Sequence, residues 1–188
     1  MTNRTYTGFV QDRLLARPNL SFDFGVRIED QRIASERNFS PRIGFAWSPF
    51  KGDKTIVRGG FGFFYDKVPL NIRAFGKYPA RTVTRYDLDG QTDISRIRFE
   101  NILVDNPTLF PLDFRTAKSD VGFVPENITW NLQIDQIINP RFSLRANYTH
   151  SRTTRLYAVD PETDFFGRSA IVLSPSGRVS YDALELTA

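Results

Sequence analysis

The sequence predicts an all-β protein, an antiparallel up-and-down meander of about seven strands that forms an incomplete segment of a large transmembrane β-barrel. Apolar and polar side chains alternate along several stretches. Aromatic residues are abundant, with 17 Phe, 7 Tyr and 2 Trp against a single Met. Short and long connections also alternate between the stretches, so the short ones would share one edge of the sheet.

Two segments form the first expected hairpin. Residues 5–15 are a strand whose alternation weakens near its end, and a turn over residues 16–19 follows. Residues 20–29 alternate without a fault, which is typical of a strand with one apolar and one polar face.

The second hairpin, residues 39–66, shows the same two-sided pattern on both sides of a turn at residues 51–54. Trp47 and Tyr65 lie near strand ends, as the aromatic girdles of a membrane barrel do. One face is expected to meet lipid and the other the barrel lumen. The lipid-facing set is Phe39, Ile43, Phe45, Val57, Phe61 and Phe63, and the lumen-facing set is Arg42, Gly44, Arg58, Gly60 and Gly62.

The remaining chain adds three strand segments and three polar connections. Strands are expected over residues 128–135, 142–151 and 179–187, and longer loops over 30–38, 67–127 and 153–178. Short turns lie at 16–19, 50–54 and 139–141. Outer-membrane barrels have this asymmetry, with short turns on the periplasmic side and long loops outside.

Composition narrows the function classes. The absence of Cys excludes disulfides and thiolate metal sites, and a single His excludes a His-based metal cluster. The net charge of +4 comes from scattered Arg rather than a basic block, so we expect no nucleic-acid partner. No apolar stretch is long enough for a membrane helix, but half-apolar barrel strands remain compatible with a mean hydropathy of −0.35. No signal peptide is visible, which indicates a protein that is not exported or a piece of a longer one.

The second hairpin resembles a motif of the Oar-like TonB-dependent receptors. Its sequence, SPRIGFAWSPF followed by KTIVRGGFGFFYD, is similar to their "PRxGFAWxPF…KTxxRGGxGxFYD" hairpin. Further similarities are VQD at residues 10–12, WNL at 130–132 with the Tyr148 to Leu156 segment, and SYDAL at 180–184. Nothing here resembles the family's plug, its TonB-binding segment or its N-terminal domain.

This resemblance implies a location and partners. Residues 1–188 would be part of a receptor barrel in the outer membrane of a Gram-negative bacterium, with a long extracellular-type loop over about 67–127. The whole receptor would take up a scarce solute, such as a chelated metal or an oligosaccharide. Expected partners are outer-membrane lipid and lipopolysaccharide, the plug and remaining strands, and indirectly the TonB system.

Two groups of side chains are candidates for binding roles. In a barrel, the lumen-facing candidates can pair with one another, contact a plug or line a solute path. They are Arg27, Arg42, Arg58, Arg145 and Asp135. Candidates in the long loop for contact with a ligand or lipopolysaccharide, because cations pair readily with phosphate, are Arg73, Lys77, Arg81 and Arg85.

No catalytic residue, metal site or cofactor is expected. His150 would have to serve a Ser triad alone, and an interfacial ring is the default. Asp160, Glu162 and Asp164 lack the Gly and terminal Glu spacing of a dedicated calcium loop. Two alternatives remain: a small hydrolase on a β scaffold, and a soluble all-β binding module. The module predicts that other parts of the chain cover the apolar faces.

Overall fold

In the computed structural model, the chain is described over residues 4–34, 36–52, 54–104, 114 and 122–188. The described residues contain one nine-stranded sheet with the strand order β1-β2-β3-β4-β7-β8-β9-β6-β5. The strands are β1 (Thr5–Arg17), β2 (Leu20–Gln31), β3 (Glu36–Trp47), β4 (Thr55–Tyr65), β5 (Arg81–Tyr86), β6 (Asp93–Leu103), β7 (Glu126–Asn139), β8 (Phe142–Thr163) and β9 (Ser169–Thr187).

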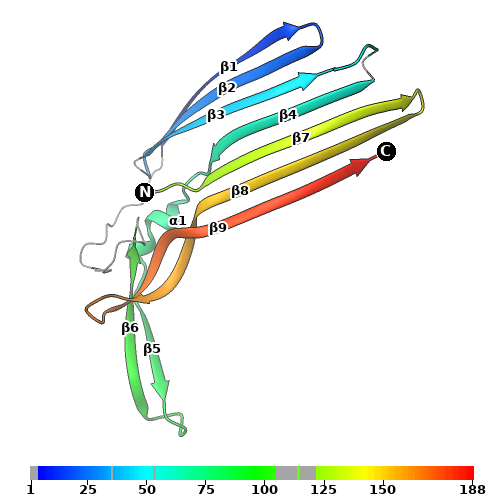
Figure 1. Cartoon of the computed structure of the whole chain (residues 1–188). Coiled ribbons are helices and arrows are strands. Elements are labelled where there is room, and N and C mark those ends of the chain that lie inside the picture. Colours follow the sequence, from blue (N-terminus) through cyan, green and yellow to red (C-terminus); the bar gives the residue numbers. More distant parts are fainter. Residues whose placement is uncertain (1–3, 35, 53, 105–113, 115–121) are drawn as a thin grey trace.

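Seven of these strands form the predicted antiparallel meander. Strands β1 to β4 and β7 to β9 pair in chain order, each antiparallel to its neighbour. They make a curved wall that does not close on itself, because β1 and β9 lie at opposite sides of it (Figure 1). The turns after β1, β3 and β7 share one end of the wall with the C terminus. The all-β fold and the open meander are thus confirmed.

Two of the expected loops are wrong. Residues 30–38 are mostly strand, since β2 reaches Gln31 and β3 begins at Glu36. Residues 153–178 are largely the outer halves of β8 and β9, which pair as far as Thr163 and Ser169. Pro161, Pro175 and Gly177 suggested a loop because such residues usually interrupt strands. Here, continued pairing with the neighbouring strand outweighs that preference.

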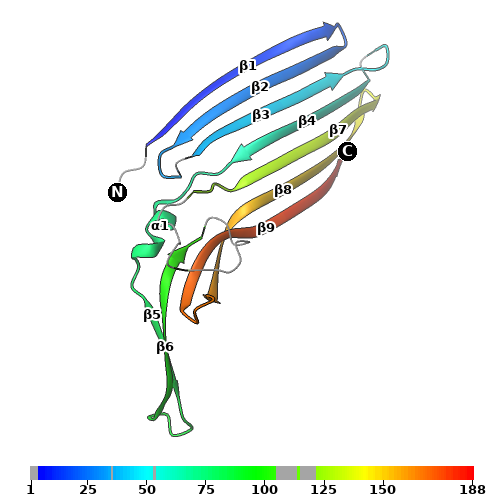
Figure 2. The same ribbon diagram turned by 60° about the vertical axis from the view of Figure 1, so that its left-hand side comes forward.

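The long connection between β4 and β7 also contains regular structure. It includes α1 (Leu70–Arg73), the 3-10 turn η1 (Phe75–Lys77) and the β5–β6 hairpin. The end of β6 pairs in parallel with the beginning of β9, from Glu100 opposite Ala170 to Leu103 opposite Leu173. The hairpin consequently projects from the far end of the wall, opposite the short turns (Figure 2).

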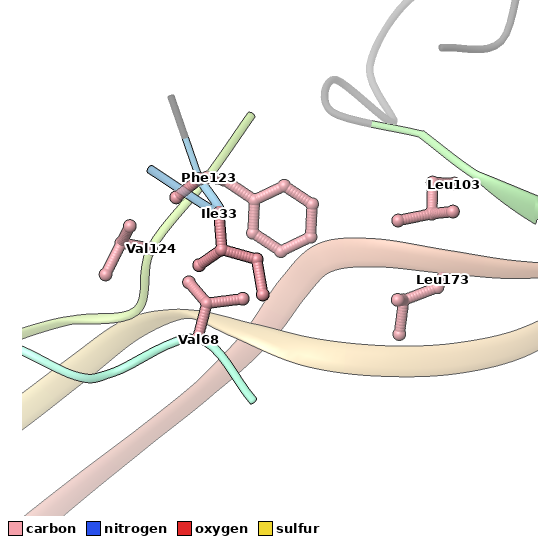
Figure 3. Close-up of a cluster of buried hydrophobic side chains, with 7 residues drawn as sticks. Ile33, Val68, Leu103, Phe123, Val124 and Leu173 are labelled. Carbon is pink, nitrogen blue, oxygen red and sulfur yellow. The ribbon is translucent and has the colours of Figure 1, made fainter. Parts of the chain in front are cut away.

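The buried apolar core lies at this same end. It brings together the β2–β3 turn, the chain after β4, the end of β6, the chain before β7 and the start of β9 (Figure 3). Gln31 is fully buried beside it, where its Nε2 donates to the Asp66 carbonyl at 2.9 Å and its Oε1 accepts from the Val68 amide at 3.0 Å. The core residues are Ile33, Ala34, Val68, Leu103, Phe123, Val124 and Leu173.

A bulge bends β8 where it leaves the regular wall. The pairing register with β9 shifts between Thr153 and Leu156, and Arg155 adopts a left-handed backbone with φ 58°. Opposite the bulge, a Cβ added to Gly177 would lie 2.8 Å from the Leu156 Cβ. A side chain at residue 177 would therefore collide with β8, and glycine permits the close approach.

The apolar face of the wall is not covered by other segments described in the structure. Phe39 is 54% exposed, Ile43 45% and Phe61 40%, although all three belong to the strictly alternating apolar set. A soluble protein rarely leaves such a contiguous face open. No helix in the described part of the chain is long and apolar enough to cross a membrane.

Candidate functional site on the polar face of the sheet

The five charged candidates share one face of the wall, which we call the polar face. Arg42 lies opposite Gly62, and residues 25 and 27 of β2 alternate onto the same side. Arg58 pairs with Gln133, and Asp135 with Arg145, on that side too. Side chains directly opposite each other in a ladder point to the same face. The five residues therefore share one surface of the sheet, and their role in lining a lumen stays a prediction.

Asp135 joins two of the arginines. Arg145 donates from Nε to Asp135 Oδ1 at 2.6 Å, and Arg58 donates from Nη1 to Asp135 Oδ2. Gln133 adds a hydrogen bond from Nε2 to Oδ2 at 2.8 Å. The carboxylate thus ties β4, β7 and β8 together near the short-turn end of the wall, and one positive charge remains in excess.

Arg27 and Arg42 lie apart from this cluster. Arg27 contacts Glu29 on its own strand at 3.2 Å, and Glu29 is only 4% exposed. The Arg42 guanidinium lies over the Phe64 ring, 4.7 Å from its centroid, in a cation–π contact. The five charged residues therefore form one cluster of three and two separate arginine contacts.

A neutral hydrogen-bond network on β7 and β8 completes the polar face. Asn127 donates from Nδ2 to Ser151 Oγ at 2.7 Å and to Thr153 Oγ1 at 2.8 Å. Thr129 donates to Asn127 Oδ1 at 2.6 Å. Sequence reasoning selected only charged residues and missed this network. Its signal was nevertheless present in the alternation of Asn, Thr and Ser with apolar residues.

Two glycines of β4 give the larger polar-face side chains room. A Cβ on Gly60 would lie 2.8 Å from Asn131 Oδ1, and one on Gly62 would lie 3.1 Å from the Phe64 ring. These glycines allow Asn131 and Phe64 to lie close to the backbone. The GGFG stretch is therefore part of strand β4.

Comparison with known proteins shows which family the chain belongs to. The model of the outer membrane beta barrel domain matches residues 29–164, well over half of the chain. The chain belongs to this family. It is accordingly a β-barrel domain of the outer membrane of Gram-negative bacteria, in agreement with the expected location. No curated protein matches the sequence.

Solved structures share the fold of this outer-membrane barrel domain at low identity. The siderophore receptor PirA from Pseudomonas aeruginosa is 14% identical, with a TM-score of 0.61 over 98% of this chain and 30% of its own. A mutant of the ferric enterobactin receptor PfeA from the same organism is 12% identical, with a TM-score of 0.67 over 98% and 24%. The outer membrane transporter YddB from Escherichia coli is 17% identical, with a TM-score of 0.67 over 98% and 21%.

The solved proteins are much longer than this chain. The chain spans only 21% to 30% of the length of the three solved proteins. The similarity is to receptors and transporters, and at these identities it establishes the fold alone. An open meander is what a fraction of such a barrel would form.

The four loop cations are spread over the projecting part of the barrel domain. Arg73 ends α1, Lys77 ends η1, and Arg81 and Arg85 lie on β5. Arg81 and Arg85 are both exposed. They share one face of the β5–β6 hairpin, since they alternate along β5 and lie opposite Phe99 and Ser95. The four cations therefore do not line a single pocket, and their contact with a ligand or lipopolysaccharide stays a proposal.

Asp164 has a structural role. Burial opposes its ionisation, yet hydrogen bonds from the amide and guanidinium of Arg168 and from the amides of Phe114 and Phe166 hold the pKa of Asp164 below its ordinary value. Its Oδ1 accepts from the Arg168 amide at 2.9 Å and its Oδ2 from Arg168 Nε at 2.8 Å. Asp164 thus closes the β8–β9 turn. Across the residues with described placement, no group of three acidic or His side chains could hold a metal.

His150 lies on the apolar face of the barrel domain, at the level of Trp130. Its Nδ1 lies 2.7 Å from Asp182 Oδ1, which also accepts from the Tyr148 hydroxyl at 2.6 Å. The His150 and Trp130 rings are 5.8 Å apart. Within the described chain no Ser hydroxyl hydrogen-bonds to His150. The geometry instead agrees with the expected interfacial ring.

Proposed function

We propose that this chain forms part of the barrel wall of an Oar-like TonB-dependent receptor, in which it contributes lipid-facing surface, lumen lining and extracellular segments. The observation that carries the proposal is the two-sided meander. Its apolar face is exposed, its opposite face is a network of charged and hydrogen-bonded side chains, and its two sides stay open for further strands. In outer-membrane barrels these faces point to lipid and lumen respectively.

The polar face suits contact with a plug inside such a barrel. The cluster of Arg58, Asp135 and Arg145 carries one excess positive charge, and Arg42 presents a cation beside the glycines of β4. An acidic segment of a plug or a negatively charged solute would be complementary to this surface. The proposed lumen residues are therefore Arg27, Arg42, Arg58, Asp135 and Arg145.

The proposed whole receptor takes up a scarce solute and has no enzymatic activity. The resemblance of the second hairpin to the Oar-like motif supports the subtype, and the fold shared with siderophore receptors supports uptake. A chelated metal and an oligosaccharide are the two solute classes we consider. The packed core at the long-loop end would hold the extracellular segments, including Arg73, Lys77, Arg81 and Arg85, in a fixed arrangement.

Uptake by the full-length protein that contains this chain tests the proposal. The protein would be produced in a Gram-negative host lacking its own receptors, with and without an active TonB system. We expect saturable accumulation of one class, ferric chelates or oligosaccharides, that disappears without TonB. Equal accumulation in both hosts would indicate a passive channel and contradict the proposal.

The soluble binding module is not favoured. It requires the apolar face to be covered, whereas Phe39, Ile43 and Phe61 are exposed in the structure. Partition of the protein into the outer-membrane fraction, and its extraction only by detergent, would agree with the barrel. Release into the aqueous fraction without detergent would favour the module.

A further inference from the structure

We propose that Arg152 and Arg178 form a binding site on the outer wall of the barrel for the phosphate groups of a lipid in the outer leaflet. The inference rests on the proposed function, because it requires the apolar face to meet lipid. It concerns a surface distinct from the lumen residues and from the loop cations on α1, η1 and β5.

The position of the site follows from one row of paired residues on the apolar face. Across β2, β3, β4 and β7 the row is apolar, and on β8 and β9 it becomes polar at His150 and Asp182. Barrel strands tilt by roughly 35–45°, so a row of paired residues rises through the membrane from strand to strand. The change marks the upper edge of the apolar belt. The row is Phe24, Ile43, Phe61, Trp130, His150 and Asp182.

The aromatic surroundings also mark an interface. Trp130 lies against Tyr148, with ring centroids 5.2 Å apart, and against His150. Tyr148 and His150 both direct polar atoms to Asp182. Rings with an apolar body and a polar edge are typical of the boundary between hydrocarbon and headgroups. The next residues toward the long-loop end should therefore lie at headgroup level.

Arg152 and Arg178 occupy that level. Arg152 lies opposite Ser180 on the apolar face, two residues beyond His150, and Arg178 shares this face because strand residues alternate. Both side chains are exposed, and neither has a hydrogen bond or ion pair within the described chain. Arg178 is a diagonal neighbour of Arg152 across the β8–β9 ladder. The planar guanidinium group of each matches the geometry of phosphate oxygens.

The acids nearby do not neutralise the two arginines. Asp182 is engaged by Tyr148 and His150. Glu126 lies on the same face of β7, opposite Thr154, but makes no ion pair with Arg152. The positive charge of the pair is therefore available to a lipid phosphate, and we assign a phosphorylated lipid headgroup rather than a protein as the partner.

Native mass spectrometry of the full-length protein tests the site. The probes are a diphosphorylated glycolipid of the lipid A type and the same lipid with both phosphates removed. We expect the wild type to bind the phosphorylated lipid more tightly than the dephosphorylated one. The affinity for the phosphorylated lipid should fall about fivefold in R152Q or R178Q and about thirtyfold in the double variant. R152K/R178K should retain most of the preference, because the charges remain.

Matched controls separate the possible outcomes. R17Q/R141Q removes two exposed arginines at the short-turn end and should leave the phosphate preference unchanged. R81Q/R85Q removes the hairpin cations, which are the competing contact for the same lipid phosphates. Loss of the preference in R81Q/R85Q alone, or its full retention in R152Q/R178Q, would overturn the site. Heat-modifiable mobility confirms a folded barrel in each variant. A wild-type protein absent from the outer membrane would instead contradict the proposed function itself.

Discussion

Asp135 connects more of the wall than any single residue of the polar face described above. It accepts from Arg145 at 2.6 Å and from Gln133 at 2.8 Å, and it also accepts from Arg58. Those donors come from three adjacent strands, and the donor Arg58 is 77 residues from Asp135 in sequence. Its loss would leave two guanidinium groups facing one another without an intervening anion.

Asp135→Asn should lower the free energy of unfolding by about 1–3 kcal/mol, because a charged hydrogen bond is lost and two cations remain. Thermal unfolding of the full-length protein in detergent measures the effect. Asp160→Asn is the control, since Asp160 is exposed, and it should change the free energy by no more than about 0.5 kcal/mol. Equal effects of the two substitutions would show that the Arg58–Asp135–Arg145 cluster does not stabilise the fold.

Asp164 makes stability depend on pH in a definite direction. The pKa of Asp164 is lowered in the folded protein, so its stabilising effect is complete above the ordinary value near 4 and is lost as the pH falls through the lowered value. The melting-temperature difference between the wild type and Asp164→Asn should therefore be constant above about pH 5 and shrink below it. A difference that does not vary with pH would contradict this assignment.

At the scale of elements, strict alternation predicted the strands well and chain breakers predicted the loops poorly. β2 begins at Leu20 and β8 at Phe142, as expected. The outer halves of β8 and β9 were missed because Pro161 in β8 and Gly177 in β9 suggested a loop. Whether such residues end a strand depends on its neighbours, and no neighbour is visible in a local pattern.

The bulge between β8 and β9 gives the outer half of this hairpin its direction. Arg155 has a left-handed backbone there, and its Nη2 donates to Glu36 Oε1 at 3.0 Å across to β3. Tyr157 follows and packs its ring 5.2 Å from Phe123 beside the core. The bend therefore brings β8 to the packed end of the molecule.

Gly177→Ala should destabilise this bend. The new Cβ would lie 2.8 Å from the Leu156 Cβ and 3.0 Å from the Leu156 carbonyl oxygen, so the backbones must separate at a cost of about 1–3 kcal/mol. Hydrogen exchange should quicken in the outer halves of β8 and β9. Gly8→Ala, whose Cβ would meet nothing within 4 Å, is the matched control. Identical exchange in both variants would show that the bend does not need a glycine.

At the scale of the whole molecule, the two faces of the wall were predictable and the packed end was not. A period of two places Ile43 and Arg42 on opposite sides whatever surrounds the sheet. The core, in contrast, brings together Ile33, Leu103 and Leu173, which are distant in sequence and lie in segments without a clear period. The shared acceptor at Asp135 likewise depends on register between strands, which alternation alone does not fix.

The central claim is that the apolar face meets lipid and the polar face meets water. These 188 residues contain no Cys. Once any Cys elsewhere in the full-length protein is replaced by Ser, a single Cys can be placed in turn at each position from 39 to 47 in outer membranes. Spin labels at these positions report collisions with lipid-soluble oxygen and with a water-soluble nickel chelate. We predict preferential oxygen contact at Phe39, Ile43, Phe45 and Trp47, and preferential chelate contact at Arg42, Gly44 and Ala46. Equal contact of both sets with the chelate would contradict the account.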